Sequence, residues 1–274
     1  MTTLPLPSPS ARHLAPATSP GHWRAGLPQT MRAEWTKLVS LRSTRWTLLT
    51  TLAGTVLVTF LSTHSAVHHN APWYRGFDPT NQSLSGLAIG SLVLGVLGIL
   101  AISGEYGTGT IRASLAAMPR RNVLLVAKVL VVGLSTLVMG EVLSFLSFFE
   151  GQAVLKGGAP TASLSQPGVL RAVALSGLFL ALFALLGLGV GLVIRHTAGS
   201  IAVFAGITFL IPILLSSISH GIARFAPELL FANSIAAVDR QPNAVSVTIG
   251  VVLMVGYCVV ALGLGAVLLH RRDA

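Results

Sequence analysis

Apolar residues are concentrated in six long runs, separated by shorter stretches that carry most of the charge. Each run is at least twenty residues long, the length that a helix needs to cross a hydrocarbon core of about 30 Å. The runs lack the polar alternation of a membrane β-strand, so the pattern predicts helices. The predicted spans lie near residues 46–67, 84–103, 123–149, 169–194, 199–219 and 245–269. We therefore predict an all-α polytopic membrane protein with a six-span domain over residues 46–272.

The region before the first span divides into two parts. Residues 1–30 are rich in Pro, Ser, Ala and Thr and lack an apolar core, which is typical of a disordered tail. Met31 is a second candidate start, because the patterned sequence begins there. From it, apolar residues recur at helical spacing and predict an amphipathic elbow helix over residues 31–45.

The predicted elbow helix has two kinds of face. Trp35 and Leu38 belong to its apolar stripe, whereas Glu34 and Lys37 fall elsewhere on the helix. An interfacial helix of this kind anchors a protein to the membrane surface. A second interpretation, compatible with the first, is that this helix also contacts a cytoplasmic partner.

Basic residues predict the orientation of the chain. With a cytoplasmic N-terminus, thirteen of the 18 lysines and arginines lie on the inner side and five on the outer side. This positive-inside bias predicts that both termini are cytoplasmic. The net charge of +10 is then explained by orientation and by contact with lipid head groups, and a nucleic-acid partner is not expected.

The sequence lacks the motifs of several enzyme classes. No lysine follows a glycine, so there is no phosphate-binding loop, and neither a zinc-protease helix motif nor an esterase elbow occurs. Cys258 is the single cysteine, and the histidines at 64, 68 and 69 have no carboxylate spaced to complete a metal site. We expect no enzyme activity, no metal and no cofactor bound by this chain.

Glu141 interrupts the third apolar run. An intramembrane charge costs about 2.5–3.5 kcal/mol on insertion scales, so Glu141 is a candidate polar site within the membrane. The alternative is a protonated or hydrogen-bonded glutamate packed near the outer mouth.

Two connections differ from ordinary loops. Residues 104–122 form a glycine-rich, basic segment between two apolar runs, predicted to lie inside. Residues 220–244 are predicted to lie outside and remain fairly apolar, so a re-entrant-like segment is expected there.

Two segments together resemble the permease subunits of bacterial type 2 ABC exporters, in the short form that lacks its own ATPase domain. Residues 31–46 resemble the amphipathic elbow helix of that family. The segment Glu-Tyr-Gly-Thr-Gly-Thr-Ile-Arg at 105–112, with Pro-Arg-Arg at 119–121, resembles the family's connection between spans two and three.

The resemblance implies that residues 104–122 are a coupling segment that docks on a separate ATPase. The candidate interface residues are Glu105, Thr108, Thr110, Ile111, Arg112, Leu115 and Met118. By helical spacing, Ile111, Leu115 and Met118 share one apolar face, with Thr108 or Thr110 as the helix cap. Glu105 is expected to pair with an arginine of this chain, and Arg120 and Arg121 to anchor the third span at the head groups.

The resemblance further implies two ATPase subunits, which carry ATP and Mg, and a second permease copy or homologue in a bacterial cytoplasmic membrane. The predicted function is export of an apolar or amphipathic substrate, such as a peptide, an antibiotic or a lipid, along a path lined by spans one, two and five. Two alternatives stay open. One is a non-transporting anchor or sensor subunit, and the other is an ion-coupled carrier that uses Glu141 as its proton site.

Overall fold

The computed structural model describes residues 26–40, 42–68, 77–117, 120–237 and 244–272, and these residues form helices and connections without a strand. Six helical segments are long and apolar enough to cross a membrane, which confirms the predicted six-span, all-α architecture. They are α2 (Arg42–His68), α4 (Leu87–Gly107), α6 (Arg121–Leu155), α7 (Val169–Ile194), the continuous run α8–η1–α9 (Thr197–Ile218) and α12 (Val247–Arg272).

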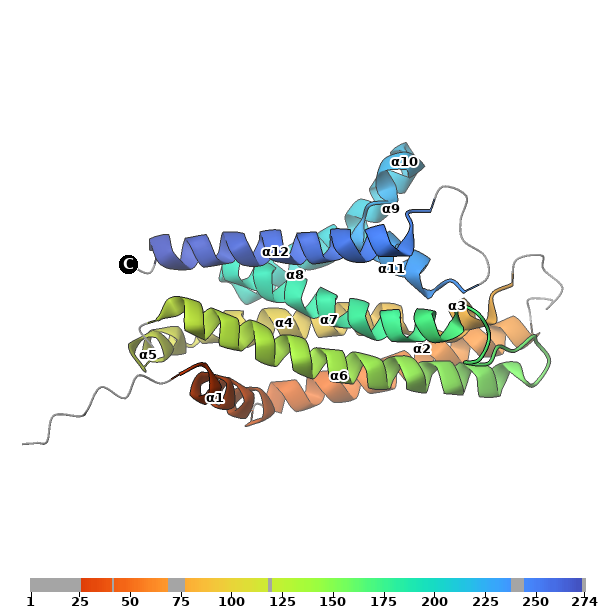
Figure 1. Cartoon of the computed structure of the whole chain (residues 1–274), viewed down its shortest axis with the longest axis horizontal. Coiled ribbons are helices and arrows are strands. Elements are labelled where there is room, and N and C mark those ends of the chain that lie inside the picture. Colours follow the sequence, from red (N-terminus) through yellow and green to blue (C-terminus); the bar gives the residue numbers. More distant parts are fainter. Residues whose placement is uncertain (1–25, 41, 69–76, 118–119, 238–243, 273–274) are drawn as a thin grey trace, which may run out of the picture.

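Within the described residues, five shorter helices accompany the spans. They are α1 (Leu27–Ser40), α3 (Pro79–Ser83), α5 (Thr110–Ala117), α10 (His220–Ala223) and α11 (Pro227–Ile235). Figure 1 shows α1, α5 and the C-terminal end of α12 at the same end of the bundle. We call this the α1/α5 end, and the opposite one, with α3 and α11, the α3/α11 end. Which end faces the cytoplasm stays a prediction.

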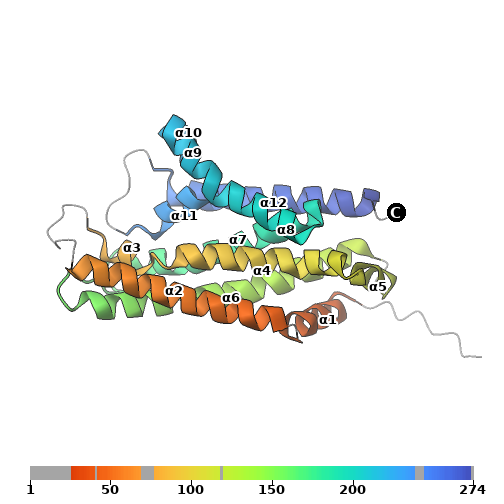
Figure 2. The same ribbon diagram turned by 180° about the vertical axis from the view of Figure 1, so that it is seen from behind.

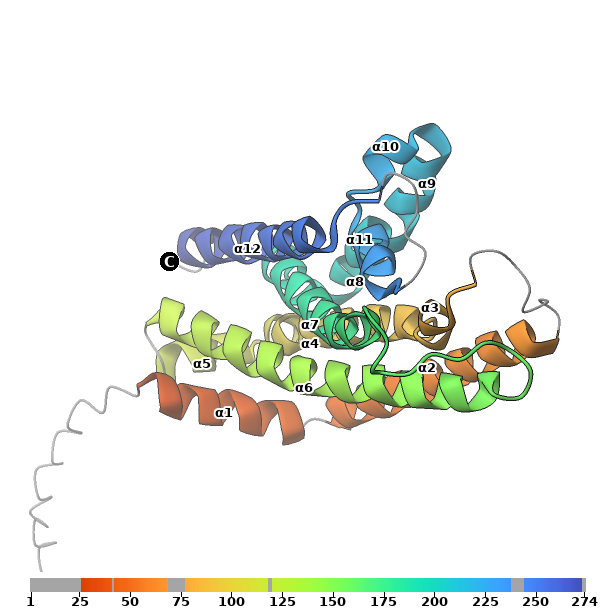
Figure 3. The ribbon, with the colours of Figure 1, turned by 45° about the vertical axis from the view of Figure 1, so that its right-hand side comes forward.

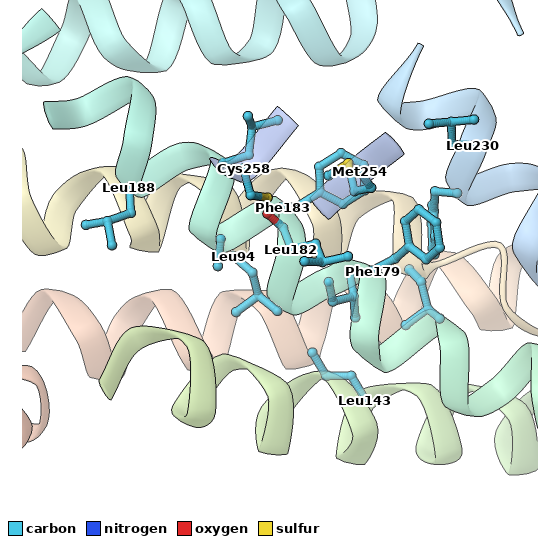
Figure 4. Close-up of a cluster of buried hydrophobic side chains, with 14 of the residues drawn as sticks. Leu94, Leu143, Phe179, Leu182, Phe183, Leu188, Leu230, Met254 and Cys258 are labelled. Atoms are coloured by element: carbon cyan, nitrogen blue, oxygen red, sulfur yellow. Dashed lines mark hydrogen bonds between the residues drawn. The ribbon is translucent and has the colours of Figure 1, made fainter. Parts of the chain in front are cut away.

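The span α7 is the centre of the bundle. About 78% of the most apolar 18-residue stretch of α7 is buried, whereas the corresponding stretches of α8–η1–α9 and α12 are each 17% buried. It packs between α4, α6 and α12, and Figure 2 shows α4, α2 and α6 on the side away from α12. Figure 4 shows side chains of α4, α6, α11 and α12 around Phe179, Leu182 and Phe183 of α7. Close helix contact contributes to this core, since a Cβ at Gly98 of α4 would overlap the backbone of Ala184 on α7.

The fifth span is bent. Its middle, Gly206–Leu210 (η1), is a π-helix, and Pro212 lies in the first turn of α9. Both features disturb the regular hydrogen-bond ladder. Figure 3 shows α9 and α10 leaning away from the other spans. The exposed apolar side chains of this segment, such as Ile213 and Ile218, therefore lie on an outer face of the chain.

Several boundaries differ from the sequence prediction. The elbow helix α1 runs over Leu27–Ser40 instead of 31–45, because Pro28 suits the first turn of a helix. The first span then begins at Arg42, so Arg42 and Arg45 belong to α2. The third span continues to Leu155, six residues past the predicted end at Phe149.

Candidate functional site

Four charged side chains meet at the α1/α5 end. Glu34 and Lys37 come from α1, Glu105 from the last turn of α4 and Lys128 from the second turn of α6. The Lys37 ammonium lies 2.7 Å from Glu34 Oε1 and 3.1 Å from Glu105 Oε1. The Lys128 ammonium lies 2.9 Å from Glu105 Oε1 and also donates to Glu34 Oε2. We call these residues the ionic quartet.

The helices place each member of the quartet. Glu34 and Lys37 are three residues apart, so they share one face of α1. That face packs on α6, where Lys128 lies. Lys128 also donates to the carbonyl oxygen of Ala101 on α4 at 3.1 Å. Lys37 donates to the hydroxyl of Ser114 on α5 at 3.0 Å. The quartet and these two bonds thus connect four helices.

The quartet is largely buried and carries no net charge. The Lys128 and Glu34 side chains are 4% and 5% exposed, Glu105 is 12% exposed, and Lys37 is 42% exposed. Each ammonium donates to three acceptors, as many as it has protons. Buried charges are tolerated when they are paired and hydrogen-bonded in this way, but the loss of one partner is costly.

Two of the charges lie outside the spans and have shifted pKa values. Burial by itself raises the pKa of the Glu34 carboxyl, but the charges and hydrogen bonds of Lys128 and Lys37 outweigh it and lower that pKa. Burial likewise lowers the pKa of Lys37, and the bonds to Glu34 and Glu105 outweigh it and raise that pKa. Both groups are therefore held in their charged forms around neutral pH.

A cavity of about 430 Å³ adjoins the quartet. It lies between α1, α2, α4 and α6, with Thr44 and Thr47 of α2 and Leu97 and Leu100 of α4 in its wall. The quartet therefore borders a hollow on one side instead of being enclosed by packed side chains.

The short helix α5 turns its apolar face inward. Ile111 is 7% exposed and belongs to the main hydrophobic core, and Leu115 packs against that core. Of the predicted interface residues, these two therefore lie on the inner face, because the helix covers the ends of its own spans. The outward face is formed by Arg112, Ala113 and Ala116, and Met118 lies outside the described residues.

Thr108 and Thr110 lie at the junction between α4 and α5. Thr108 donates to the carbonyl oxygen of Gly104 at 2.8 Å, and its hydroxyl lies 2.9 Å from that of Thr110. Gly109 between them has a φ of +72°, a conformation that favours glycine. The turn into α5 is thus set by Gly109 together with the threonine hydroxyls.

The arginines of this end have other partners than predicted. Glu105 pairs with Lys37 and Lys128 instead of an arginine. Arg121 donates to the carbonyl oxygens of Leu269 and His270 at 3.1 and 3.2 Å, so it caps the end of α12 instead of only meeting head groups. Arg120 is exposed.

Lys128 is the residue of this site that sequence reasoning missed. In the sequence it is one of the thirteen basic residues on the predicted inner side, which serve only to orient the chain. A charge inside an apolar run was nevertheless a signal, by the same physical rule that singled out Glu141.

Trp35 and Leu38 of the elbow helix have separate environments. The Trp35 ring is 52% exposed, as expected for a side chain at a membrane interface. Leu38 is partly buried and packs against the hydrophobic core.

Glu141 lies apart from the quartet. It is thirteen residues beyond Lys128 on α6, which corresponds to about 20 Å along a helix. A Cβ at Gly177 of α7 would come within 2.6 Å of the Glu141 carboxylate, so the carboxylate is packed against that glycine. The structure does not bring Glu141 and the quartet together.

The histidine pair on α2 does not form a metal centre within the described residues, where no three candidate ligands cluster. The rings of His64 and His68 lie 4.3 Å apart, and His69 lies outside the described residues.

A protein-family model matches most of the chain. Residues 80–274, more than two thirds of the chain, match the family model described as ABC-2 family transporter protein. This match begins at α3 and extends to the C-terminus, so it includes α5, Glu105 and Lys128 but not the elbow helix. No curated protein matches the chain significantly.

Proposed function

This chain belongs to the ABC-2 transporter family, and we propose that it is the permease subunit of an exporter driven by a separate ATPase. The proposal places the α1/α5 end at the cytoplasm, in agreement with the excess of basic residues there. ATP and Mg would be bound by the partner, because the chain has no phosphate-binding loop.

The ionic quartet is the observation that carries this proposal. Through Lys37 and Ser114, α5 is bonded to the elbow helix, and through Glu105 and Lys128 the elbow helix is bonded to α4 and α6. A displacement of α5 by a docked ATPase would therefore act on two spans through charged contacts that are costly to break. The neighbouring cavity leaves space for such a displacement.

The outward face of α5 is the surface proposed to meet the ATPase. It presents the Arg112 side chain beside the small residues Ala113 and Ala116, which allow a partner to approach closely. The face is only eight residues long, so the elbow helix beside it would contribute to the same contact.

A second permease copy would cover the apolar outer face of the fifth span. Ile213, Leu214 and Ile218 are 63%, 54% and 81% exposed. In the proposed assembly, a path for an apolar or amphipathic substrate runs between the two copies.

The test is co-purification with an ATPase encoded beside this chain. Arg112→Glu combined with Ala116→Asp should weaken co-elution and abolish stimulation of ATP hydrolysis. The first change reverses a positive charge on the proposed docking face, and the second adds a negative charge there. Arg224→Glu is the matched control, since Arg224 is exposed at the α3/α11 end. Equal behaviour of both variants and the wild type would overturn the proposed role of α5.

A further inference from the structure

A second hollow, with a volume of about 410 Å³, lies beneath the elbow helix. It runs between α2 and α6, and it shares Leu38, Thr44 and Leu97 with the cavity beside the quartet. We call it the elbow groove, defined by Trp35, Leu38, Arg45, Leu134, Val138 and Val142.

The α6 wall of the groove faces away from the protein core. Leu134, Val138 and Val142 follow one another at four-residue spacing and are 56%, 66% and 54% exposed. They cover about 12 Å along the helix. In a membrane-spanning helix such a face meets lipid chains, so the groove is open to the hydrocarbon of the bilayer.

The polar atoms of this wall are already bonded. The Ser135 hydroxyl donates to the carbonyl oxygen of Val132 at 3.0 Å, and the Thr136 hydroxyl donates to the same oxygen at 2.7 Å. The wall therefore offers little to a polar ligand, and the part of a ligand that lies along it should be apolar.

The end of the groove near α1 is polar, unlike the α6 wall. Arg45 is exposed and is the one charged side chain among the described residues that line the groove. The half-exposed Trp35 ring lies at the same end. A guanidinium binds phosphate with paired hydrogen bonds, and an indole ring prefers the level of lipid head groups.

We propose that the elbow groove binds an anionic phospholipid of the leaflet at the α1/α5 end. One acyl chain lies along α6 over Leu134, Val138 and Val142, and the phosphate is held by Arg45. Trp35 and Leu38 line the groove, whereas Glu34 and Lys37 on the same helix belong to the quartet. The bound lipid thus holds the elbow helix in its place against α2 and α6. Lipid binding at this groove goes beyond the proposed transport function, because it requires neither the ATPase nor a transported substrate.

Photolabelling tests this site with the full chain in phosphatidylcholine nanodiscs. The probe is a trace of phosphatidylglycerol with a diazirine in one acyl chain, and labelled residues are mapped by peptide mass spectrometry. Labelling should concentrate on residues 134–142 and exceed that of the exposed face of α12. Val138→Phe should lower it by filling the groove, whereas Val126→Phe, an equal change on α6 outside the groove, should leave it unchanged.

A pair of arginine variants tests the head-group contact. Arg45→Gln should lower labelling about tenfold, the factor expected for one lost charge-assisted hydrogen bond. Arg42→Gln, also exposed but outside the groove, should have little effect. Uniform labelling of all apolar faces, or equal effects of the two arginine variants, would overturn the proposal. Either result would mean that the probe contacts the chain only as annular lipid. If Val138→Phe fails to fold, the comparison of Arg45→Gln with Arg42→Gln tests the proposed site by itself.

Discussion

Lys37 of the elbow helix and Glu105 of the second span form an ion pair of 3.1 Å across 68 residues of sequence. The same Glu105 oxygen also accepts from Lys128 of the third span at 2.9 Å. Glu105 therefore links the two cations of the quartet, as Glu34 also does. The strength of the connection between α1, α4 and α6 depends on these charges being present together.

Loss of Lys128 should be the most damaging single change in the quartet. Lys128→Met leaves Glu34 and Glu105 with fewer partners in a buried setting, and breaking a buried pair in this way costs about 3–5 kcal/mol. The measurement is the thermal unfolding of the purified protein in detergent. Lys156→Met is the matched control, because Lys156 is exposed just past the end of the same helix and should be nearly neutral.

Combining Lys128→Met with Glu34→Gln should cost less than the sum of the two single changes. The double variant removes both buried charges of one pair, so less uncompensated charge is left. Additive losses would show that the two side chains do not stabilise each other.

Acidification should weaken the quartet through Glu34. Its pKa is lowered in the folded chain, so its contribution to stability is present above the ordinary value of 4.5 and is lost as the pH falls below it. The difference in melting temperature between the wild type and Glu34→Gln should therefore be largest near neutral pH and shrink below about pH 4.5. A difference that does not change with pH would contradict this origin of the stability.

Glu228 should behave in the opposite way. It lies in the first turn of α11, and burial raises its pKa from 4.5 to about 7. Because the unfolded chain loses this proton first, stability falls as the pH rises from 4.5 to 7. Glu228→Gln should then be more stable than the wild type at pH 8, by about 3 kcal/mol at most, and equal to it at pH 4.5. Thermal unfolding at the two pH values provides the check, and a gain of the same size at both would refute it.

The spans were predictable from sequence because twenty apolar residues in a row have few other uses. The quartet was not predictable from sequence, because its members come from three helices. They lie together only because of the way α1 packs on α6. Lys128 carried a signal of its own, but a lysine near the end of a span equally suits the membrane surface.

The direction of α5 shows a second limit of sequence reasoning. Ile111 and Leu115 share a helical face, as their spacing predicted. A spacing rule identifies an apolar face but does not say whether a partner or the protein's own core covers it. Here the core covers it, and the outward surface belongs to Arg112, Ala113 and Ala116.

The contact between α4 and α7 should tolerate no side chain at Gly98. A Cβ there would overlap the carbonyl group of Ala184, which is backbone and cannot turn aside. Gly98→Ala must therefore separate the two helices at the centre of the bundle, and we expect a loss of about 1–3 kcal/mol, as for other overpacked cores.

Gly256→Ala provides the control for this change. Gly256 lies on an exposed face of α12, and a Cβ there would meet nothing within 4 Å. Because alanine favours a helix over glycine, this variant should be neutral or more stable by about 0.5–1 kcal/mol. Thermal unfolding of both variants in one detergent separates the effects. If Gly98→Ala melts at the wild-type temperature, then α4 and α7 do not pack as closely as this contact requires.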